Sequence, residues 1–157
     1  MMQNEISRII EQVEQLYTSN NWVGFNLDEL LNCITDEVAN FKLSLFNNTI
    51  HQIANHIVSD SVVIKRLQGI DYKLSNNEIW VPKNEIKCKW KDTVKEIRNN
   101  KIELIRQLQV LSDDRLNQPI LKGHKSIYVN IHGFIQYSYY HFGQIAIMHK
   151  AITLYNK

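Results

Sequence analysis

The sequence is poor in the residues that tight turns, disulfides and membrane spans require. Its 157 residues include only 5 glycines, 2 prolines and 2 cysteines. So few glycines and prolines argue against an all-β protein and against a glycine-rich nucleotide-binding loop. No apolar run approaches the ~18 residues of a membrane-spanning helix. The cysteines, Cys33 and Cys88, lie too far apart in the sequence to form a metal-type pair.

Neither sign of charge predominates, because 18 basic residues accompany 16 acidic ones and the formal net charge is +2. That balance is too even to indicate a nucleic-acid or membrane partner, so we expect neither. The N-terminal residues have no basic start and no apolar run, which predicts that there is no signal peptide. Together with two reduced thiols, this favours a cytoplasmic location.

A lysine-rich stretch at residues 83–95, with Trp80 and Trp90 nearby, allows two interpretations. It could be a nucleic-acid patch with stacking rings, or a solvated loop and helix start whose tryptophans lie in the core. Glu85 and Asp92 dilute the positive charge of the stretch. We therefore favour the second interpretation.

Apolar residues recur at three- and four-residue steps in four long segments, and no segment shows a convincing strand alternation. This periodicity predicts long helices near residues 5–19, 49–68, 90–111 and 126–155, and a shorter one at 27–34. Residues 35–46 stay unassigned, and residues 70–88 form a long link. Since no linker or repeat divides residues 1–157, we expect one all-α domain, a four-helix bundle. The links between the helices are long, so the sequence does not predict which helices are antiparallel neighbours.

Two of these helices also carry recognisable end signals. Thr49 and Gln52 have the spacing of a capping box at the start of the second long helix, and Gly69 suits its left-handed end. Asn26 with Glu29 predicts a similar cap for the shorter helix.

The chemistry of the chain depends on six histidines, which are His51, His56, His124, His132, His141 and His149. Helical bundles commonly build metal sites from inward side chains of facing helices. A helix advances about 100° per residue, so His51 and His56 point about 140° apart and cannot face one pocket. His56 lies nearer to the main apolar stripe of its helix, which makes it the better candidate.

In the last helix, His141 shares a stripe with Tyr137, whereas His132 and His149 lie off that stripe. The angles thus favour His56 from one helix with Tyr137 and His141 from the other. No carboxylate lies on the Tyr137/His141 stripe, which weakens a di-iron interpretation. The plainer alternative stays open, because a histidine on a partly apolar face is more often a hydrogen-bonded core residue than a ligand.

Three stretches together resemble the DinB/YfiT-like superfamily. They are WVGF at 22–25, TIHQIANH at 49–56 and GFIQYSYYHFGQI at 133–145, of which YHFGQI at 140–145 is the most specific. The resemblance covers nearly the whole chain. It implies a four-helix bundle, frequent homodimers and a divalent metal, commonly zinc or nickel, held by three histidines. Some members transfer a low-molecular-weight thiol such as bacillithiol, and others are related to isomerases and hydrolases that use thiol cofactors.

Residue by residue, the resemblance assigns His56 as the first metal ligand and His141 as the last. The middle histidine falls at Tyr137, which departs from the pattern, and a catalytic zinc normally has three protein ligands. Tyr137 could bind as a phenolate or only hydrogen-bond a water, and Asp60, one turn from His56, could supply the third ligand. His51 points away and more simply replaces a packing residue.

We therefore expect a DinB-like bundle with a pocket lined by His56, Tyr137 and His141. A bound metal would stabilise a thiolate or activate water for attack on an electrophilic small molecule, as in a transferase or hydrolase. Tyr137 would be a ligand or an acid near the leaving group. The alternative is a metal-free, non-catalytic bundle that binds a small ligand or acts as a dimeric structural protein. Apolar surface on the last helix and around Trp22 favours a homodimer in either case.

Overall fold

The computed structural model describes residues 4–18, 21–22, 24, 26–59 and 61–155. Every regular element within these residues is helical, apart from one isolated bridge between Pro119 and Ser126. The prediction of an all-α protein is therefore confirmed for the part of the chain that is described. In that same part, no helix combines the length and the hydrophobicity that a membrane crossing requires.

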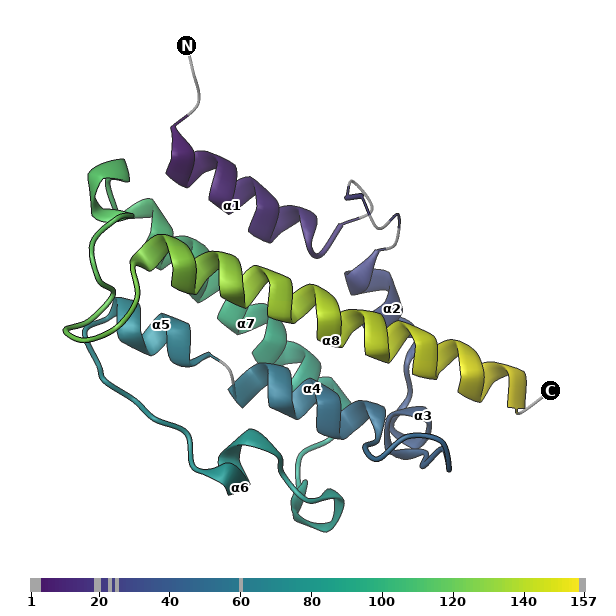
Figure 1. Cartoon of the computed structure of the whole chain (residues 1–157). Helices are drawn as coiled ribbons and strands as arrows, with labels where there is room; N and C mark the ends of the chain where they lie inside the picture. Colours follow the sequence, from purple (N-terminus) through teal and green to yellow (C-terminus); the bar gives the residue numbers. More distant parts are fainter. Residues whose placement is uncertain (1–3, 19–20, 23, 25, 60, 156–157) are drawn as a thin grey trace.

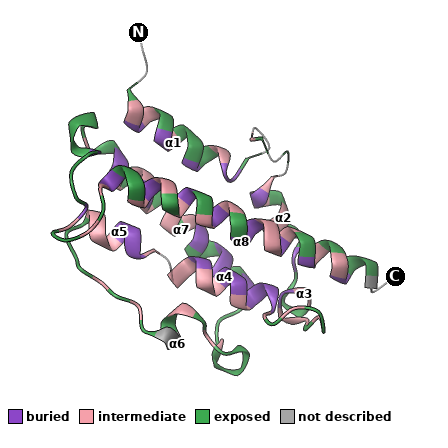
Figure 2. Ribbon diagram, in the orientation of Figure 1, coloured by how far each residue is buried: buried purple, intermediate pink, exposed green. Residues whose placement is uncertain are grey.

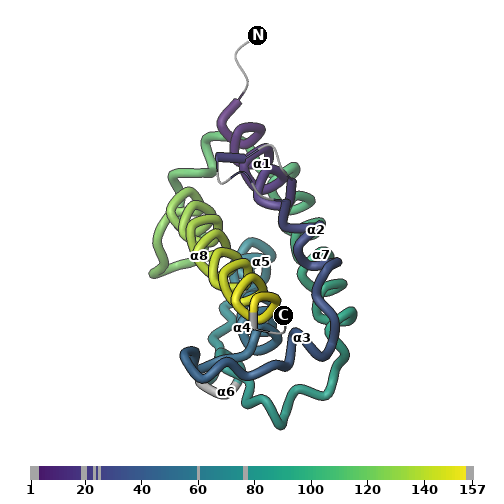
Figure 3. The backbone as a smooth tube through the Cα atoms, turned by 90° about the vertical axis from the view of Figure 1, so that its right-hand side faces the viewer, coloured from purple at the N-terminus to yellow at the C-terminus, as the bar shows by residue number. Residues whose placement is uncertain are grey.

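The principal helices are α1 (Glu5–Gln15), α4 (Ile50–Ser59), α5 (Val62–Leu67), α7 (Trp90–Gln109) and α8 (Ile127–Tyr155). The connections hold the short helices α2 (Leu27–Cys33), α3 (Asp36–Asn40) and α6 (Asn76–Ile79), and the 3-10 turns Lys83–Glu85 and Asp113–Arg115. The helix α8 runs along the length of the molecule, with α6 outside the main group of helices (Figure 1). In the view turned by 90°, α1, α2 and α7 lie opposite α8 (Figure 3). The helix α4 packs against both α7 and α8, so its two flanks face different partners.

The helix predicted at residues 49–68 is divided into α4 and α5. Its start is the predicted capping box, in which the Gln52 amide donates to Thr49 Oγ1 at 3.2 Å and the Thr49 amide to Gln52 Oε1 at 3.1 Å. The division follows Ser59, whose hydroxyl donates to the His56 carbonyl at 2.8 Å. A serine bonded back to its own helix competes with the regular ladder, a local effect that periodicity does not register. Gly69 ends α5 with φ +84°, as predicted.

Other boundaries differ from the sequence prediction by a few residues or by a short added element. The first helix ends at Gln15 and the third at Gln109. Residues 35–46, which had no assignment, contain α3, whose first turn is capped by Thr35 accepting from the Val38 amide at 3.3 Å. The link 70–88 contains α6 and a 3-10 turn. The cap on α2 is as predicted, with Asn26 Oδ1 accepting from Glu29 at 3.2 Å.

The buried side chains of the described residues form two clusters. One surrounds Trp90 and Phe142, the other surrounds Leu104 and Ile131, and Tyr139 packs against both. The buried positions lie on the inward sides of the principal helices, while the described residues of the long connections are mostly half-buried or exposed (Figure 2). The candidate site lies between α8 and the side of α4 that is covered by α6 and the long connection around it.

Candidate functional site

The structure brings together the three side chains that the sequence singled out. Because α4 packs on α8, the ring of His56 lies 4.7 Å from that of His141, centroid to centroid, at an interplanar angle of 89°. The ring of Tyr137 lies 4.4 Å from His141 and 5.3 Å from His56. His141 is buried, and the other two are half-buried. These residues form one aromatic group between the two helices.

Each of the two imidazoles is held by one hydrogen bond at the same ring atom. His56 Nδ1 lies 2.8 Å from the Ile79 carbonyl oxygen, and His141 Nδ1 lies 2.8 Å from Gln144 Oε1. An oxygen acceptor requires the proton on Nδ1, so in the neutral rings each Nε2 keeps its lone pair. Both rings are thus oriented in the tautomer that presents Nε2.

The surroundings keep both rings uncharged near neutral pH. Burial lowers the pKa of His56, and although the bond to the Ile79 carbonyl opposes this, the nearby His141 lowers it further. Burial also lowers the pKa of His141, against the opposing effect of Gln144. A neutral imidazole is the form that binds a metal ion or accepts a proton.

Tyr137 uses its hydroxyl to bind the neighbouring helix. The phenol donates to the backbone carbonyl of His56 at 3.3 Å. That carbonyl also accepts from Ser59, at the point where α4 ends. Binding a metal as phenolate would require Tyr137 to lose the proton that it places on this carbonyl.

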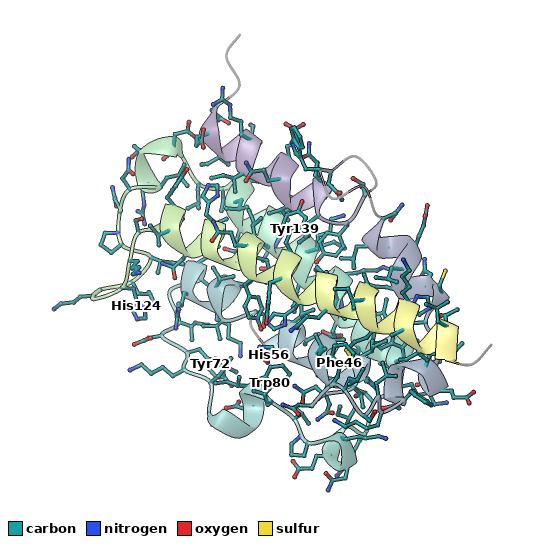
Figure 4. All side chains as sticks on the ribbon, turned by 45° about the vertical axis from the view of Figure 1, so that its right-hand side comes forward. Phe46, His56, Tyr72, Trp80, His124 and Tyr139 are labelled. Atoms are coloured by element: carbon teal, nitrogen blue, oxygen red, sulfur yellow. The ribbon has the colours of Figure 1, made fainter. Side chains whose placement is uncertain are left out.

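Trp80 covers the exposed face of His56. The two rings stack with centroids 3.9 Å apart and planes 21° from parallel, and Figure 4 shows the side chains next to each other. The sequence predicts that both tryptophans lie in the core, which is confirmed for Trp90, 4% exposed, but wrong for Trp80, which is 37% exposed. The adjacent Ile79 carbonyl binds the same imidazole, so the link 70–88 supplies two contacts to His56. This link lacks helical periodicity, and nothing in the sequence indicated its role.

A pocket of about 480 Å³ opens beside this group. Of the three predicted residues, only His141 lines it, so the expected pocket lined by His56 and Tyr137 as well is not found there. The lining combines amides with aromatic and aliphatic side chains, namely Leu45, Phe46, Asn47, Asn48, Ile53, Trp80, Tyr140, His141, Gln144 and Met148. Such a lining suits a small molecule that has an apolar body and a few hydrogen-bonding groups.

Among the residues that the structure describes, no three histidine, cysteine, aspartate or glutamate side chains come together as a ready ligand set. Asp60, the predicted alternative third ligand, lies outside the described residues. His56 and His141 nevertheless fit a metal by their chemistry, since each has an anchored Nδ1 and an available Nε2.

Three of the remaining histidines have other neighbours. His51 lies beside Asn40 and Thr93, His124 beside Asp71 at 3.3 Å, and His132 beside the ring of Tyr128 at 4.2 Å. The separation of His51 from His56 follows from the angle between them on α4. The sequence indicates no histidine partner for Cys88, yet the Cys88 sulfur lies 3.9 Å from His51 Nε2.

Comparison of the chain with protein-family models and with curated proteins gave no match. The assignment to the DinB/YfiT-like superfamily therefore stays a prediction from the motifs. The function has to be argued from the geometry of the site itself.

Proposed function

We propose that the chain is a DinB-like four-helix bundle in which His56 and His141 hold a divalent metal, zinc or nickel. Four helical segments are available for such a bundle, namely α1, α4 with α5, α7 and α8. The observation that carries the metal assignment is the pair of imidazoles, each with Nδ1 bonded to an oxygen. Metal-binding histidines have this second bond, because it fixes the ring and makes Nε2 a better ligand.

The reaction that this site supports best is transfer or hydrolysis on a small electrophile. A bound metal would supply Lewis acidity, which stabilises a thiolate or activates water. The substrate would occupy the pocket beside His141, where Asn47 and Asn48 offer amide groups and Trp80 offers a flat apolar wall. A low-molecular-weight thiol is a suitable nucleophile for this pocket. Tyr137 would serve as third ligand or as an acid close to the leaving group.

A metal-free, ligand-binding function is the second candidate, and two observations favour it. Trp80 stacks over His56 at 3.9 Å, and the Tyr137 hydroxyl is already bonded to the His56 carbonyl. With both contacts in place, His56 and Tyr137 lie behind His141 and Trp80, which line the pocket. The protein would then bind its small molecule through aromatic contacts and amides, without catalysis.

A calorimetric titration with zinc or nickel distinguishes the two candidate functions. We expect the parent to bind about one equivalent of zinc or nickel, and His56→Ala and His141→Ala each to weaken binding by at least about tenfold, ~1.4 kcal/mol. His132→Ala is the matched control, because His132 lies on the same helix α8 beside Tyr128 and away from this group. Equal binding by all four proteins, or none by the parent, would favour the metal-free candidate.

We further propose that the protein is a cytoplasmic homodimer. Several large apolar side chains are exposed, among them Trp22, Tyr140, Ile147 and Leu154, and the last three lie on α8. Tyr140, Ile147 and Leu154 are spaced by seven residues and so share one side of α8, and apolar side chains exposed on one side of a helix commonly mark a contact between subunits. Both cysteines are free, as is usual in a reducing compartment. Light scattering at micromolar concentration tests the dimer, and a monomer mass would contradict it.

A further inference from the structure

A second polar cluster lies on the other flank of α4, away from His56. It joins four side chains from separate segments: Asn40 at the end of α3, His51 in the first turn of α4, Cys88 in the link and Thr93 in the first turn of α7. His51 Nδ1 lies 3.3 Å from Asn40 Oδ1, and His51 Nε2 lies 2.9 Å from Thr93 Oγ1. Cys88 Sγ lies 3.3 Å from Thr93 Oγ1 and 3.9 Å from His51 Nε2.

The hydrogen bonds of this cluster share one order of donors and acceptors, which is fixed by Asn40. Asn40 Nδ2 donates to the Asp36 carbonyl at 2.8 Å, which turns Asn40 Oδ1 toward His51 as an acceptor. His51 Nδ1–H must donate to that oxygen, so the neutral ring accepts at Nε2 from the Thr93 hydroxyl. With its proton given to His51, Thr93 Oγ1 can accept from the Cys88 thiol. The chain of donors therefore leads from sulfur to imidazole.

His51 is held as the neutral imidazole, the form in which Nε2 can accept a proton. It is 1% exposed, and the ring of Trp90 packs against it edge-on at a centroid distance of 5.6 Å. Burial lowers the pKa of His51, partly opposed by the carboxylate of Asp36. The ring is consequently neutral at pH 7, and its orientation is fixed by contacts with three separate segments. A thiol paired with an oriented imidazole is the arrangement that generates nucleophilic cysteines.

Cys88 itself is exposed and lines a small pocket of about 200 Å³. The other lining residues include charged side chains of both signs, an amide, a hydroxyl and one aliphatic side chain; they are Asn55, Val58, Asp92, Thr93, Lys95 and Glu96. Lys95 suits a carboxylate, while Asp92 and Glu96 suit an ammonium group. The pocket therefore complements a small zwitterion, such as an amino-acid-like thiol.

We propose that Cys88 is a reactive thiol that exchanges with the disulfide of a small zwitterionic thiol. The Cys88 proton passes through the Thr93 hydroxyl to His51 Nε2, and the thiolate attacks one sulfur of the disulfide. A new bond joins Cys88 to that sulfur while the original S–S bond breaks. The other half leaves as a thiolate and takes the proton from His51. Cys88 is oxidised to a mixed disulfide, and one molecule of the small thiol is released in its reduced form.

Cys33 provides an internal control for this proposal. It is also exposed and free, but within the described part of the chain no hydrogen bond joins it to a histidine or a hydroxyl group. The variants Cys33→Ser and Cys88→Ser each leave one thiol, whose alkylation by iodoacetamide can be followed by mass spectrometry at pH 7. We expect the Cys88 thiol to react at least about tenfold faster than the Cys33 thiol. In 8 M urea, where the cluster is lost, the two rates should converge.

Four further substitutions at three positions, each made in the Cys33→Ser background, test the route of the proton. Thr93→Val removes the hydroxyl but keeps the shape, and His51→Gln removes the proton acceptor. Both should lower the rate to that of the Cys33 thiol. Asn40→Ala, which removes the oxygen that orients His51, should lower it several-fold, whereas Asn40→Asp retains an acceptor and should preserve it. Circular dichroism before each reaction confirms that the variant is folded.

The exchange step is tested with cystine against the uncharged bis(2-hydroxyethyl) disulfide. We expect cystine to form a mixed disulfide with Cys88. For each cysteine, the rate with cystine is divided by the rate with the uncharged reagent, and this ratio should be at least about threefold larger for Cys88 than for Cys33. Lys95→Ala should remove this preference. Equal alkylation rates for the two cysteines in the folded protein would overturn the proposal. An unchanged rate in folded Thr93→Val would overturn the proton route, and an equal preference for cystine at both thiols would overturn the substrate class.

Discussion

The two flanks of α4 use histidine in opposite ways. His51 is buried, and both of its nitrogens bond to side chains of the protein, Asn40 and Thr93. His56 is half-buried; its Nδ1 bonds to a backbone carbonyl, and its ring face is covered by Trp80. A ring with both nitrogens committed cannot bind a metal, whereas a ring with one committed nitrogen can. The flank with the more buried histidine is thus the structural and proton-accepting one, and the other flank is the candidate metal site.

Removing each histidine gives the largest test of this difference. His51→Ala deletes two hydrogen bonds in a closed space and leaves Thr93, itself 3% exposed, with one partner fewer. We expect it to lower the free energy of unfolding by about 2–4 kcal/mol, and His56→Ala by only about 1 kcal/mol. Urea unfolding at pH 7 measures both values. Equal losses would mean that the two flanks do not differ in this way.

The angle between the two histidines could be predicted from sequence, but their partners could not. Helical periodicity placed His51 and His56 on different sides of one helix, and the fold agrees. The sequence suggested that His51 merely replaces a packing residue, whereas it is bonded to residues 11 and 42 positions away. One of these, Asn40, lies in a segment that had no assignment. Contacts of this range depend on how helices pack, which local patterns do not encode.

The second test restores the third nitrogen on the His56 flank. Tyr137 stands where the DinB/YfiT-like pattern, which the chain resembles, has a histidine, and its ring lies 4.4 Å from His141. Tyr137→His supplies a neutral nitrogen and avoids the deprotonation that a phenol requires before it binds a metal. We expect zinc or nickel to bind at least about tenfold more tightly, or ~1.4 kcal/mol, by calorimetric titration.

Two controls belong to that experiment. Adding His56→Ala to Tyr137→His should abolish the gain, because the site then loses a ligand. Asp60→Ala in the parent tests the predicted carboxylate alternative: if Asp60 is already the third ligand, this variant loses affinity and Tyr137→His adds little. Failure of Tyr137→His to bind metal would leave the metal-free function as the better candidate.

The third test is the dependence of stability on pH, to which both flanks contribute in the same direction. The pKa values of His51, His56 and His141 are all lowered in the folded state. Above the unfolded value of about 6.5 the rings are neutral in both states, so stability is fully present. As the pH falls below that value, the unfolded chain binds protons that the folded chain does not. Stability should therefore fall between pH 7 and pH 5.

Urea unfolding at pH 7, 6 and 5 measures this slope. His51→Gln and His56→Gln should each flatten it, because each removes a group that takes up its proton mainly on unfolding. Glu78 and Glu103, whose pKa values are lowered to about 2, should contribute mainly below this window. A parent that becomes more stable toward pH 5 would show that these rings gain anionic partners instead.

The candidate site could be predicted in its helical part but not in its cover. His56, Tyr137 and His141 come from periodic helices, and the turn angle of a helix was enough to place them together. Trp80 and the Ile79 carbonyl come from the link 70–88, where no periodic pattern exists. Gln144 lies three residues after His141 on α8, but the hydrogen bond between them depends on side-chain rotamers. Trp80 and Gln144 consequently line the pocket beside His141, together with residues that the sequence did not single out.

Replacing Trp80 tests that cover and has the smallest expected effect. A stacked pair of aromatic rings contributes about 0.5–1.5 kcal/mol, and Trp80 is 37% exposed, so Trp80→Ala should lower the free energy of unfolding by about 1 kcal/mol or less. Opening the face of His56 to water should also raise its pKa toward the ordinary value, since burial is the main cause of the lowering. An NMR titration of the His56 ring measures this change, with Trp80→Phe as the variant that keeps a ring over the imidazole. If His56 titrates alike in the parent and in Trp80→Ala, α4 and α8 bury the imidazole by themselves, and the link only supplies the carbonyl that orients it.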